Sequence, residues 1–311
     1  MDLNKIKDFL RKEIGKKGVA ISSLCEKLEI KDYELLGVIE LLKKDGMMLD
    51  VIGDTVIKAP KPQIKNDVYE IKSNLEHLKL LLLSDTHLGS KYDRLDILKY
   101  VYKKAEELGI QIVLHSGDMV DGSYPNRSNQ IYELKVHGAD EQTDYVVQNY
   151  PTFDGQTLFI TGNHDFTHIR NDGYNIGRAI AKQRNDMIYL GEDVADVKIG
   201  GLKIRLFHGA GGRAYSKSYK LQRYVETIPL EERPDIQAMG HFHDAFYMPY
   251  QGVHCFQVPA LLDQTPFARQ MGMPNLKGVW WIDVDFDKKG NVYSVKSELE
   301  TFESKVLRKK K

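Results

Sequence analysis

The chain has 311 residues, of which 42% are hydrophobic and 28% are charged, an ordinary composition for a globular protein of about two domains. Lysine plus arginine and aspartate plus glutamate both number 44, so the formal net charge is +0. This balance excludes a protein that attracts nucleic acid through an overall basic field, and it excludes the acidic excess typical of disordered chains.

Residues 1–58 are predicted to form a small N-terminal domain of three helices and a β-hairpin. Apolar residues recur at three- and four-residue steps in stretches that predict helices over 3–14, 23–28 and 32–45. Ser23 and Asp32 are expected to cap the second and third helices. Two short apolar runs on either side of residues 52–54 predict the hairpin. In this order, the elements resemble a winged helix-turn-helix domain.

If this domain binds DNA, the helix over 32–45 is the one expected to enter the major groove. Residues 1–66 carry 13 lysines and arginines against 11 aspartates and glutamates, a net charge of only +2. So small an excess gives weak attraction to phosphates. Two kinds of partner therefore stay open for the domain: DNA, or another protein, including a second copy of the chain in a homo-oligomer.

The rest of the chain has the rhythm of an α/β domain. Pro60 and Pro62 punctuate residues 59–67, which are expected to be a linker. Beyond them, strand-like apolar runs over 79–84, 110–115, 157–161, 186–190, 203–207 and 235–240 alternate with helical stretches over 93–108, 139–149 and 174–184. From residue 245 onward the sequence is rich in strand-like segments. This order predicts an α/β domain with mixed sheets over residues 68–303. A basic tail over 304–311 is expected to be frayed.

Polar residues follow directly after five of these apolar runs, in short segments rich in glycine. They are Asp85 and His87, then Asp118, then Asn163, His164 and Asp165, then His208, and finally His241 and His243. Because ligands bind beyond the carboxyl ends of the strands in α/β sheets, we expect these side chains to lie together at one rim.

The types of these residues indicate a metal site. Carboxylate, imidazole and carboxamide groups are ligands for manganese, iron or zinc, and no thiolate is among them. A carboxylate that bridges two cations builds a two-metal site, which polarises a phosphoryl group and generates hydroxide near neutral pH. A single histidine at a strand end more often has a structural role, but five of them beside aspartates favour metal binding.

Five short motifs occur in a fixed order: D-x-H at Asp85, GDxxDG around Asp118, GNHD around Asn163, HGA at His208 and GHxH around His241. This series resembles that of the calcineurin-like metallophosphoesterases, and the resemblance covers about residues 78–300. It implies a four-layer α/β/β/α sandwich and a metal-dependent enzyme that hydrolyses phosphate esters.

The same resemblance implies a role for each motif residue. A first metal ion would be bound by Asp85, His87, Asp118 and His243, and a second by Asp118, Asn163, His208 and His241. Asp118 would then bridge the two ions, and Asp121 is expected behind the ligands. We expect two divalent cations, Mn²⁺ foremost, with iron or zinc as alternatives.

His164 is not a metal ligand in the family pattern. It would face the scissile phosphate and stabilise or protonate the leaving oxygen, and Asp165 would orient its ring. A hydroxide that bridges the two metal ions would be the nucleophile.

The substrate is less strongly specified than the reaction. The segment SDTHLGS around Asp85, followed by GDxxD, resembles the nuclease subunits of double-strand-break repair complexes, including bacterial SbcD. Basic residues near the motifs are candidates for contacting phosphate, namely Arg127, Arg170, Arg213 and Lys217. Tyr215 and Tyr219 alternate with the last two, as suits a nucleic-acid backbone with a stacked base. The ordinary alternative for residues 209–220 is a solvated helix start.

These features favour a two-metal phosphodiesterase, specifically a nuclease that hydrolyses DNA. Two other interpretations stay open. One is a small-molecule phosphoesterase, acting for example on cyclic nucleotides, with the N-terminal domain used for assembly. The other is a DNA-binding regulator in which the phosphoesterase domain is a scaffold.

Cysteine usage and apolar runs bear on the compartment. Cys25 and Cys255 are the only cysteines, which favours a reducing cytoplasm. The N-terminus mixes charged and apolar residues and is not expected to be a signal peptide. The longest apolar run, LKLLLL ending at Leu83, is far shorter than the ~20 residues that span a bilayer. We therefore expect a cytoplasmic protein with no membrane partner.

Overall fold

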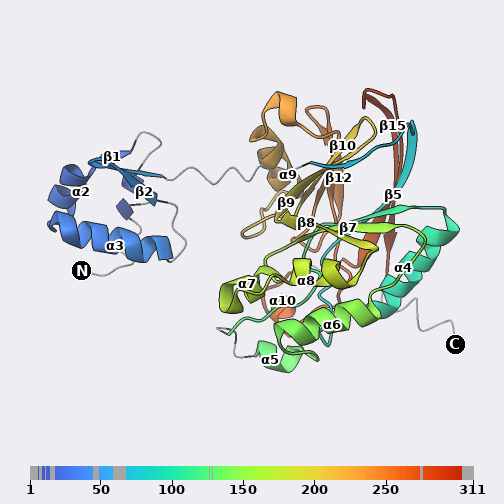
Figure 1. The fold of residues 1–311 in the computed structure, drawn as a ribbon, viewed down its shortest axis with the longest axis horizontal. Helices are drawn as coiled ribbons and strands as arrows, with labels where there is room; N and C mark the ends of the chain where they lie inside the picture. Colours follow the sequence, from blue (N-terminus) through green and yellow to red (C-terminus); the bar gives the residue numbers. More distant parts are fainter. Residues whose placement is uncertain are drawn as a thin grey trace. The chain divides into compact units, whose positions relative to one another are not determined.

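The computed structural model describes residues 6, 9, 10, 12–14, 18–44, 49–58, 68–125, 127, 129–273 and 276–302. The chain divides into two compact units, Met1–Lys65 and Asn66–Lys311. Each unit has its own elements, many of them labelled in Figure 1, and each is described by itself. Every helix in the described part of the chain is too short or too polar to cross a membrane.

The first unit packs helices against a three-stranded antiparallel sheet of order β1-β3-β2. Its described elements are β1 (Val19–Ala20), α2 (Ile21–Leu28), α3 (Asp32–Lys44), β2 (Leu49–Ile52) and β3 (Thr55–Lys58). Buried apolar residues from α2, α3 and the strands share one core with Ile6, Leu10 and Ile14. The hairpin predicted around residues 52–54 is confirmed by the pairing of β2 with β3.

Two helix starts in this unit differ from the sequence prediction. Ser23 does not cap α2, because the helix follows β1 directly and begins at Ile21, with Ala20 at its N-cap. Asp32 lies inside the first turn of α3, where its charge favours the helix N-terminus. The side chain of Glu34 accepts the backbone N–H of Lys31 instead (2.8 Å).

Three other predictions fall partly or wholly on residues outside the described ranges. They are the remainder of the helix over 3–14, the linker over 59–67, and the basic tail over 304–311.

The second unit contains two six-stranded mixed sheets. The first sheet has the order β15-β14-β5-β6-β7-β8, and the second has the order β12-β13-β11-β10-β9-β4. Strands of the first sheet are β5 (His77–Leu83), β6 (Ile112–His115), β7 (Gln156–Thr161), β8 (Met187–Glu192), β14 (Gly278–Phe286) and β15 (Val292–Thr301). Strands of the second are β4 (Tyr69–Ile71), β9 (Val194–Ile199), β10 (Leu202–Phe207), β11 (Ile236–Met239), β12 (Phe246–Tyr250) and β13 (Val253–Gln257).

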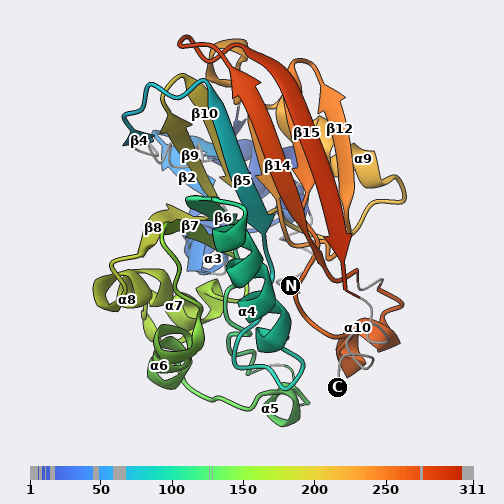
Figure 2. The ribbon, with the colours of Figure 1, turned by 90° about the vertical axis from the view of Figure 1, so that its right-hand side faces the viewer.

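The two sheets enclose one apolar core, and helices cover their outer faces. Leu80 and Leu82 of β5 belong to the core between the sheets. Leu81 and Leu83 point the other way and pack with residues of α4 (Leu95–Glu107), α6 (Ala139–Asn149) and α8 (Ile176–Gln183). Figure 2 shows β5, β14 and β15 side by side, with α4 in front of β6. Burial on both faces explains why β5 is a continuous apolar run.

The outer face of the second sheet is covered by α9 (Lys217–Glu226). Leu221 and Val225 of this helix are fully buried against Met239, Val253 and Cys255 of the strands. The second unit therefore has four layers in succession: helices, the first sheet, the second sheet and a helix.

The six predicted strands correspond to β5, β6, β7, β8, β10 and β11, and the three predicted helices to α4, α6 and α8. Strands β12, β13, β14 and β15 lie in the strand-rich region predicted from residue 245 onward. The pattern did not predict β4, β9, α5 (Gln130–Glu133), α7 (Phe166–Asp172) or α10 (Pro266–Gln270). The motif-bearing strands β5, β6 and β7 lie in the first sheet, whereas β10 and β11 lie in the second. The site is therefore built where the strand ends of two facing sheets meet.

Candidate metal centre

Loops that follow five strands converge at the site and are joined to each other by hydrogen bonds. The backbone N–H of Asp85, after β5, donates to Gly117 O after β6 (2.9 Å). The backbone N–H of His241, after β11, donates to Asp85 Oδ2 (3.0 Å). The His208 ring, after β10, donates from Nδ1 to Ser116 O (2.8 Å). These bonds fix the polar side chains at the junction of the two sheets.

Many of the motif residues have a backbone conformation that L-residues rarely adopt. Among the described residues, eight other than glycine have positive φ, and five of these are Asp85 (52°), His87 (43°), Asp118 (54°), His241 (75°) and His243 (50°). Such left-handed positions are strained for residues with a side chain and concentrate at functional sites. The chain therefore bends sharply at each of these residues to aim its side chain inward.

Asp118 lies between two groups of potential ligands. Its Oδ2 is 3.1 Å from His208 Nε2 and 3.9 Å from His87 Nε2, so one oxygen faces both groups. Its Oδ1 accepts the backbone N–H of His164 (2.7 Å), which holds the carboxylate in this orientation. Asp118 is only 1% exposed.

The first group consists of Asp85, His87 and His243, whose ligand atoms all lie within 4.8 Å of one another. The Nε2 atoms of His87 and His243 face each other at 3.3 Å. Asp85 Oδ1 is buried without a hydrogen bond, although His243 Nε2 lies 3.3 Å away. Because a buried carboxylate oxygen is normally hydrogen-bonded, this arrangement fits a divalent cation as the missing partner.

The second group consists of Asp118, His208 and His241, with ligand atoms within the same limit of 4.8 Å. Asn163 Oδ1 lies 3.2 Å from His208 Nε2 and so faces this group as well. Glycine at position 162 allows Asp118 and His208 to approach the backbone closely. A Cβ at this position would lie 2.5 Å from both Asp118 Oδ1 and His208 Nε2.

Hydrogen bonds behind the site determine which ring nitrogens face it. His208 donates from Nδ1 to Ser116 O, and His87 from Nδ1 to Asp121 Oδ1 (3.1 Å). His241 donates from Nε2 to Gly211 O (3.0 Å). The unprotonated nitrogens left to bind a cation are therefore Nε2 of His87 and His208 and Nδ1 of His241.

The electrostatics of the site favour bound cations. Burial opposes charge on Asp118, but the surrounding histidines hold its pKa well below the usual range. Burial lowers the pKa of His208, yet Asp118 raises it overall to about 10. In the same way, Asp121 and Asp118 outweigh burial and raise the pKa of His87 to about 9. Without a metal ion, protons on these rings would neutralise the carboxylates; a divalent cation can take that role.

His164 also borders the first group, but its ring is held differently from the prediction. His164 Nδ1 donates to the backbone oxygen of Asp121 (2.7 Å). Burial lowers the pKa of His164 to about 4, so Nε2 carries no proton at neutral pH in the free protein.

The prediction that Asp165 orients His164 is wrong. Asp165 is fully buried and accepts backbone N–H groups of Met119 (3.2 Å), Val120 (2.9 Å) and Gly162 (2.8 Å). Because successive side chains leave the chain in different directions, the carboxylate braces the loops instead of the neighbouring ring. Burial and the nearby Asp118 raise the pKa of Asp165 to about 7.

Tyr124 is a site residue that the sequence did not indicate. The Asn163 amide donates from Nδ2 to Tyr124 Oη (2.9 Å), which directs Oδ1 of the same amide toward His208. Burial raises the pKa of Tyr124 to about 12, so its hydroxyl stays protonated. A tyrosine six residues after Asp118 carries no signal of this role in the sequence alone.

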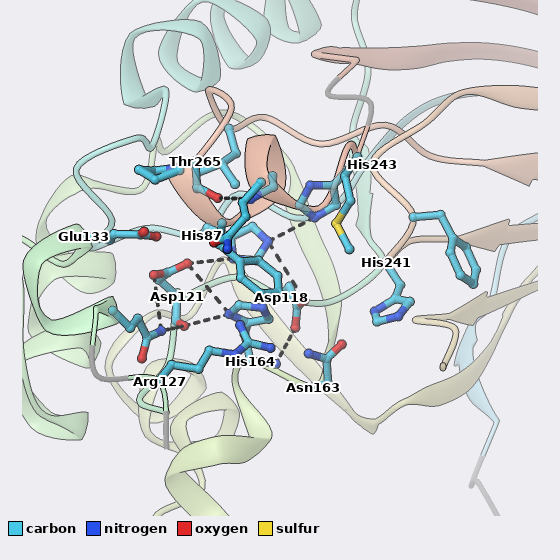
Figure 3. Close-up of a pocket in the computed structure, with 18 of the residues that line it drawn as sticks. His87, Asp118, Asp121, Arg127, Glu133, Asn163, His164, His241, His243 and Thr265 are labelled. Carbon is cyan, nitrogen blue, oxygen red and sulfur yellow. Dashed lines mark hydrogen bonds and ion pairs between the residues drawn. The ribbon is translucent and has the colours of Figure 1, made fainter. Parts of the chain in front are cut away.

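A pocket of about 370 Å³ opens beside the two groups. Figure 3 shows His87, Asp118, His164 and His243 pointing toward one another at its base. Further lining residues come from the loop before α5, from the segment after β10, and from α10 with the residues around it. A concave site with convergent polar groups is typical of ligand binding.

The four basic candidates are placed differently. Arg127 lines the pocket, and so does Arg213, but Arg213 pairs with Asp244 (3.1 Å). Lys217, at the start of α9, pairs with the same carboxylate (2.8 Å) and is not among the lining residues. Arg170 lies over the ring of Phe166 and is likewise not among the lining residues. Asp244, only 3% exposed, is the common ion-pair partner of Arg213 and Lys217. The sequence pattern did not indicate this role.

Comparisons with known proteins agree with this geometry. Residues 78–259 match the family described as the calcineurin-like phosphoesterase superfamily domain. The DNA polymerase II small subunit of Methanocaldococcus jannaschii is 22% identical over 291 residues, which cover 77% of this chain and 46% of that protein. An uncharacterized metallophosphoesterase of Helicobacter pylori is 25% identical over 119 residues, covering 38% of this chain and 32% of that protein.

The chain thus spans less than half the length of these curated relatives. Among solved structures, an archaeal phosphodiesterase is similar with a TM-score of 0.42 and 14% identity, covering 72% of this chain and 100% of that one. More than half of the chain matches the family, and its buried His/Asp groups could hold metal ions. The chain belongs to the calcineurin-like phosphoesterase superfamily.

Proposed function

We propose that this protein is a metal-dependent phosphoesterase, specifically a phosphodiesterase that hydrolyses nucleic-acid phosphodiester bonds, with DNA as its substrate. The observation that carries the proposal is the position of Asp118, whose Oδ2 faces both His87 and His208 beside an open pocket. A carboxylate shared by two groups of ligands is the arrangement that places two cations on one phosphoryl group.

The ligand assignment is part of the proposal. Asp85, His87, Asp118 and His243 would bind one divalent cation, and Asp118, Asn163, His208 and His241 would bind the other. Manganese fits this oxygen and nitrogen set, as do iron and zinc. Bound cations would neutralise the phosphate charge and lower the pKa of water at the site.

The remaining groups of the site act through hydrogen bonds and charge. Asp121 holds both His87, through its side chain, and His164, through its backbone oxygen. With Nδ1 fixed in this way, His164 Nε2 is the atom left to face the substrate. An anionic phosphate beside it raises the pKa of the ring, so His164 could then hold a proton for the leaving oxygen.

Support for nucleic acid comes from three sources. The motif series resembles that of the SbcD-type nucleases, and one relative of the chain is described as a DNA polymerase II small subunit. The first unit, whose described elements follow the order β1, α2, α3, β2 and β3, is proposed to be a winged helix-turn-helix domain. Arg127 brings a guanidinium group, which suits phosphate recognition, to the pocket. A cytoplasmic location belongs to the same proposal.

One observation favours a protein partner for the first unit. Helix α3 exposes Tyr33 (68%), Leu36 (39%) and Leu41 (49%), and Glu34 and Glu40 lie on the same helix. An apolar and acidic surface suits a protein interface better than a DNA backbone. Assembly, including a homo-oligomer, is therefore the second candidate role for this unit.

A substrate panel tests the proposed function. The purified protein is incubated in the presence of Mn²⁺ with one substrate per reaction. The substrates are bis-p-nitrophenyl phosphate, single-stranded DNA, duplex DNA, RNA and cyclic nucleotides. We expect metal-dependent turnover of the simple diester and of DNA, abolished by a chelator. Turnover of cyclic nucleotides alone would replace the nuclease proposal with a small-molecule phosphodiesterase. No turnover of any diester with any divalent metal would reject phosphodiesterase activity.

A further inference from the structure

Three side chains stack beside the pocket, and two of them, Arg127 and Phe267, line its wall. The guanidinium carbon of Arg127 lies 4.1 Å from the centre of the Tyr124 ring and 4.5 Å from the centre of the Phe267 ring. The Tyr124 ring in turn meets the His164 ring edge to face, with centres 4.9 Å apart. Two chain segments far apart in the sequence therefore meet beside the proposed reaction centre.

Arg127 differs from Arg213 and Lys217, the other basic candidates near the pocket, in its ion pairing. Within the described residues, no carboxylate forms an ion pair with Arg127, whereas Asp244 neutralises both Arg213 and Lys217. Glu133 lines the same pocket, and Arg127 acts on it only at a distance. A guanidinium stacked through its faces keeps its N–H edge for an anionic oxygen. Arg127 is thus the described cation best placed to contact a phosphate.

Phe267 is an apolar ring that solvent reaches although it lines the pocket. The residue is 38% exposed and belongs to α10, whose start is capped by Thr265 Oγ1 accepting the backbone N–H of Ala268 (3.1 Å). Gln264 Nε2 donates to Met273 O (3.0 Å) and closes the segment that carries the helix. Hydrogen bonds therefore hold in place the segment that carries the ring. An exposed flat aromatic surface in a pocket suits stacking of a planar ligand.

We propose that Phe267 and Arg127, backed by Tyr124, form a nucleoside subsite: the base stacks on Phe267 and the edge of Arg127 binds a phosphate oxygen. This inference rests on the proposed function and narrows its substrate. A base inside a duplex already has both faces stacked, so only an unpaired nucleotide can offer a face to Phe267. The substrate class is therefore single-stranded nucleic acid, a strand end or a free nucleotide ester.

The test uses two esters with the same leaving group, thymidine 5′-(p-nitrophenyl phosphate) and methyl p-nitrophenyl phosphate. The metal-loaded wild type should favour the nucleoside ester in kcat/KM by about 5- to 150-fold, the range expected for one stacked base. Phe267→Ala should bring the ratio close to one, mainly by raising KM for the nucleoside ester, while Phe267→Tyr, which keeps a ring, should retain it. Arg127→Ala should lower kcat/KM for the nucleoside ester further than Arg127→Lys does.

Tyr293→Ala is the matched control, because Tyr293 is 71% exposed on β15 and is not a lining residue; its ratio should equal that of the wild type. A ratio that survives in a folded Phe267→Ala protein overturns the subsite, as does a wild-type ratio of one, and the second result leaves the proposed function intact. If the wild type hydrolyses neither ester, the proposed function fails, and equilibrium binding decides the subsite. Thymidine 5′-phosphate must then bind more tightly than inorganic phosphate, and Phe267→Ala must remove the difference.

Discussion

Asp118 shows how much of the site depends on a single side chain. One of its oxygens faces His87 and His208, and the other accepts the backbone N–H of His164. Asparagine would retain the second contact and tolerates the left-handed φ of 54°. The charge and the shared ligand atom would be lost, whereas the fold would be kept.

We therefore expect Asp118→Asn to fold normally and to lose tight binding of both metal ions. The affinity should fall by more than the roughly 10–100-fold that loss of an outer-shell partner costs. Elemental analysis after gel filtration and circular dichroism measure the two properties. The exposed Asp154→Asn serves as control. Two tightly bound equivalents in Asp118→Asn would refute the shared-ligand assignment.

His164 should behave differently, because its proposed role is not that of a ligand. For His164→Ala we expect near-normal metal content and a loss of turnover of about 10²–10⁴-fold on substrates with poor leaving groups, the range for a positioned proton donor. Nitrophenyl esters need little protonation and should lose less. Steady-state kinetics on both substrate types give the comparison, and equal losses would argue for charge stabilisation alone.

His115 links a single buried residue to acid stability. Gly117 N–H donates to its Nδ1 (3.2 Å), and its Nε2 donates to Thr86 Oγ1 (3.1 Å). Burial lowers the pKa of His115 to about 3, compared with about 6.5 in the unfolded chain. The unfolded state therefore binds more protons below pH 6.5, and the stabilising contribution present above that pH is lost as the pH falls toward 3.

Between about pH 5.5 and 4, where the unfolded group is protonated and the folded one is not, this one group should remove about 1.4 kcal/mol of unfolding free energy per pH unit. His115→Gln should flatten the slope by that amount, whatever its effect on stability at pH 7. Urea unfolding of the chelator-treated protein at several pH values measures it. His137→Gln, at an exposed position, should keep the wild-type slope, and an unchanged slope in His115→Gln would contradict the prediction.

At the scale of elements, the motif-bearing strands were predictable because each is an apolar run closed by polar residues. Membership of two sheets was not, since β6 and β11 have the same fully buried pattern yet lie in different sheets. The ring orientations were also hidden, because they depend on backbone oxygens of Ser116, Asp121 and Gly211. The role predicted for Asp165 failed for the same reason. Its position next to His164 in the sequence does not reveal that its carboxylate accepts backbone N–H groups instead.

The segment between β10 and α9 illustrates how an element controls the site. Asp244 holds Arg213 and Lys217, and within that segment Gly211 O accepts the His241 ring N–H. Arg213 and Lys217, which are expected to bind phosphate, thus each form an ion pair with this buried carboxylate. Of the two interpretations of residues 209–220, the helix start describes Lys217, where α9 begins.

Asp244→Asn should loosen this loop. Trypsin cleaves after arginine and lysine, so we expect faster cleavage after Arg213 and Lys217, read by mass spectrometry of a time course. Metal affinity should fall modestly, within the roughly 10–100-fold range of outer-shell changes, because His241 loses its anchored partner. Glu226→Gln, which affects an ion pair at the other end of α9, is the control. Unchanged cleavage in Asp244→Asn would show that the ion pairs do not restrain the loop.

At the scale of the whole molecule, the chain divides into two compact units. All the metal-binding groups proposed here lie within Asn66–Lys311. Removing residues 1–65 should therefore leave metal content and turnover of bis-p-nitrophenyl phosphate within about twofold of the full chain. If the first unit contacts DNA, the truncated protein should bind DNA more weakly and with a flatter salt dependence, because each lost phosphate contact removes one counterion from the slope.

Titration of DNA binding at several salt concentrations, with light scattering for the mass in solution, gives both readouts. Unchanged affinity and slope would reject DNA contact by the first unit. If truncation lowers the number of chains per particle and leaves the salt slope unchanged, the exposed apolar residues of α3 would be assigned to assembly.

The five left-handed positions of the site have an evolutionary consequence. A strained non-glycine residue costs about 1–3 kcal/mol, so five of them together approach the 5–15 kcal/mol that is the usual net stability of a domain. Glycine at any of Asp85, His87, Asp118, His241 or His243 would relieve that cost. In a lineage that used the unit only as a scaffold, drift toward glycine at these positions would be rewarded with stability. Aspartate or histidine at all five positions is the pattern expected where the reaction is kept under selection.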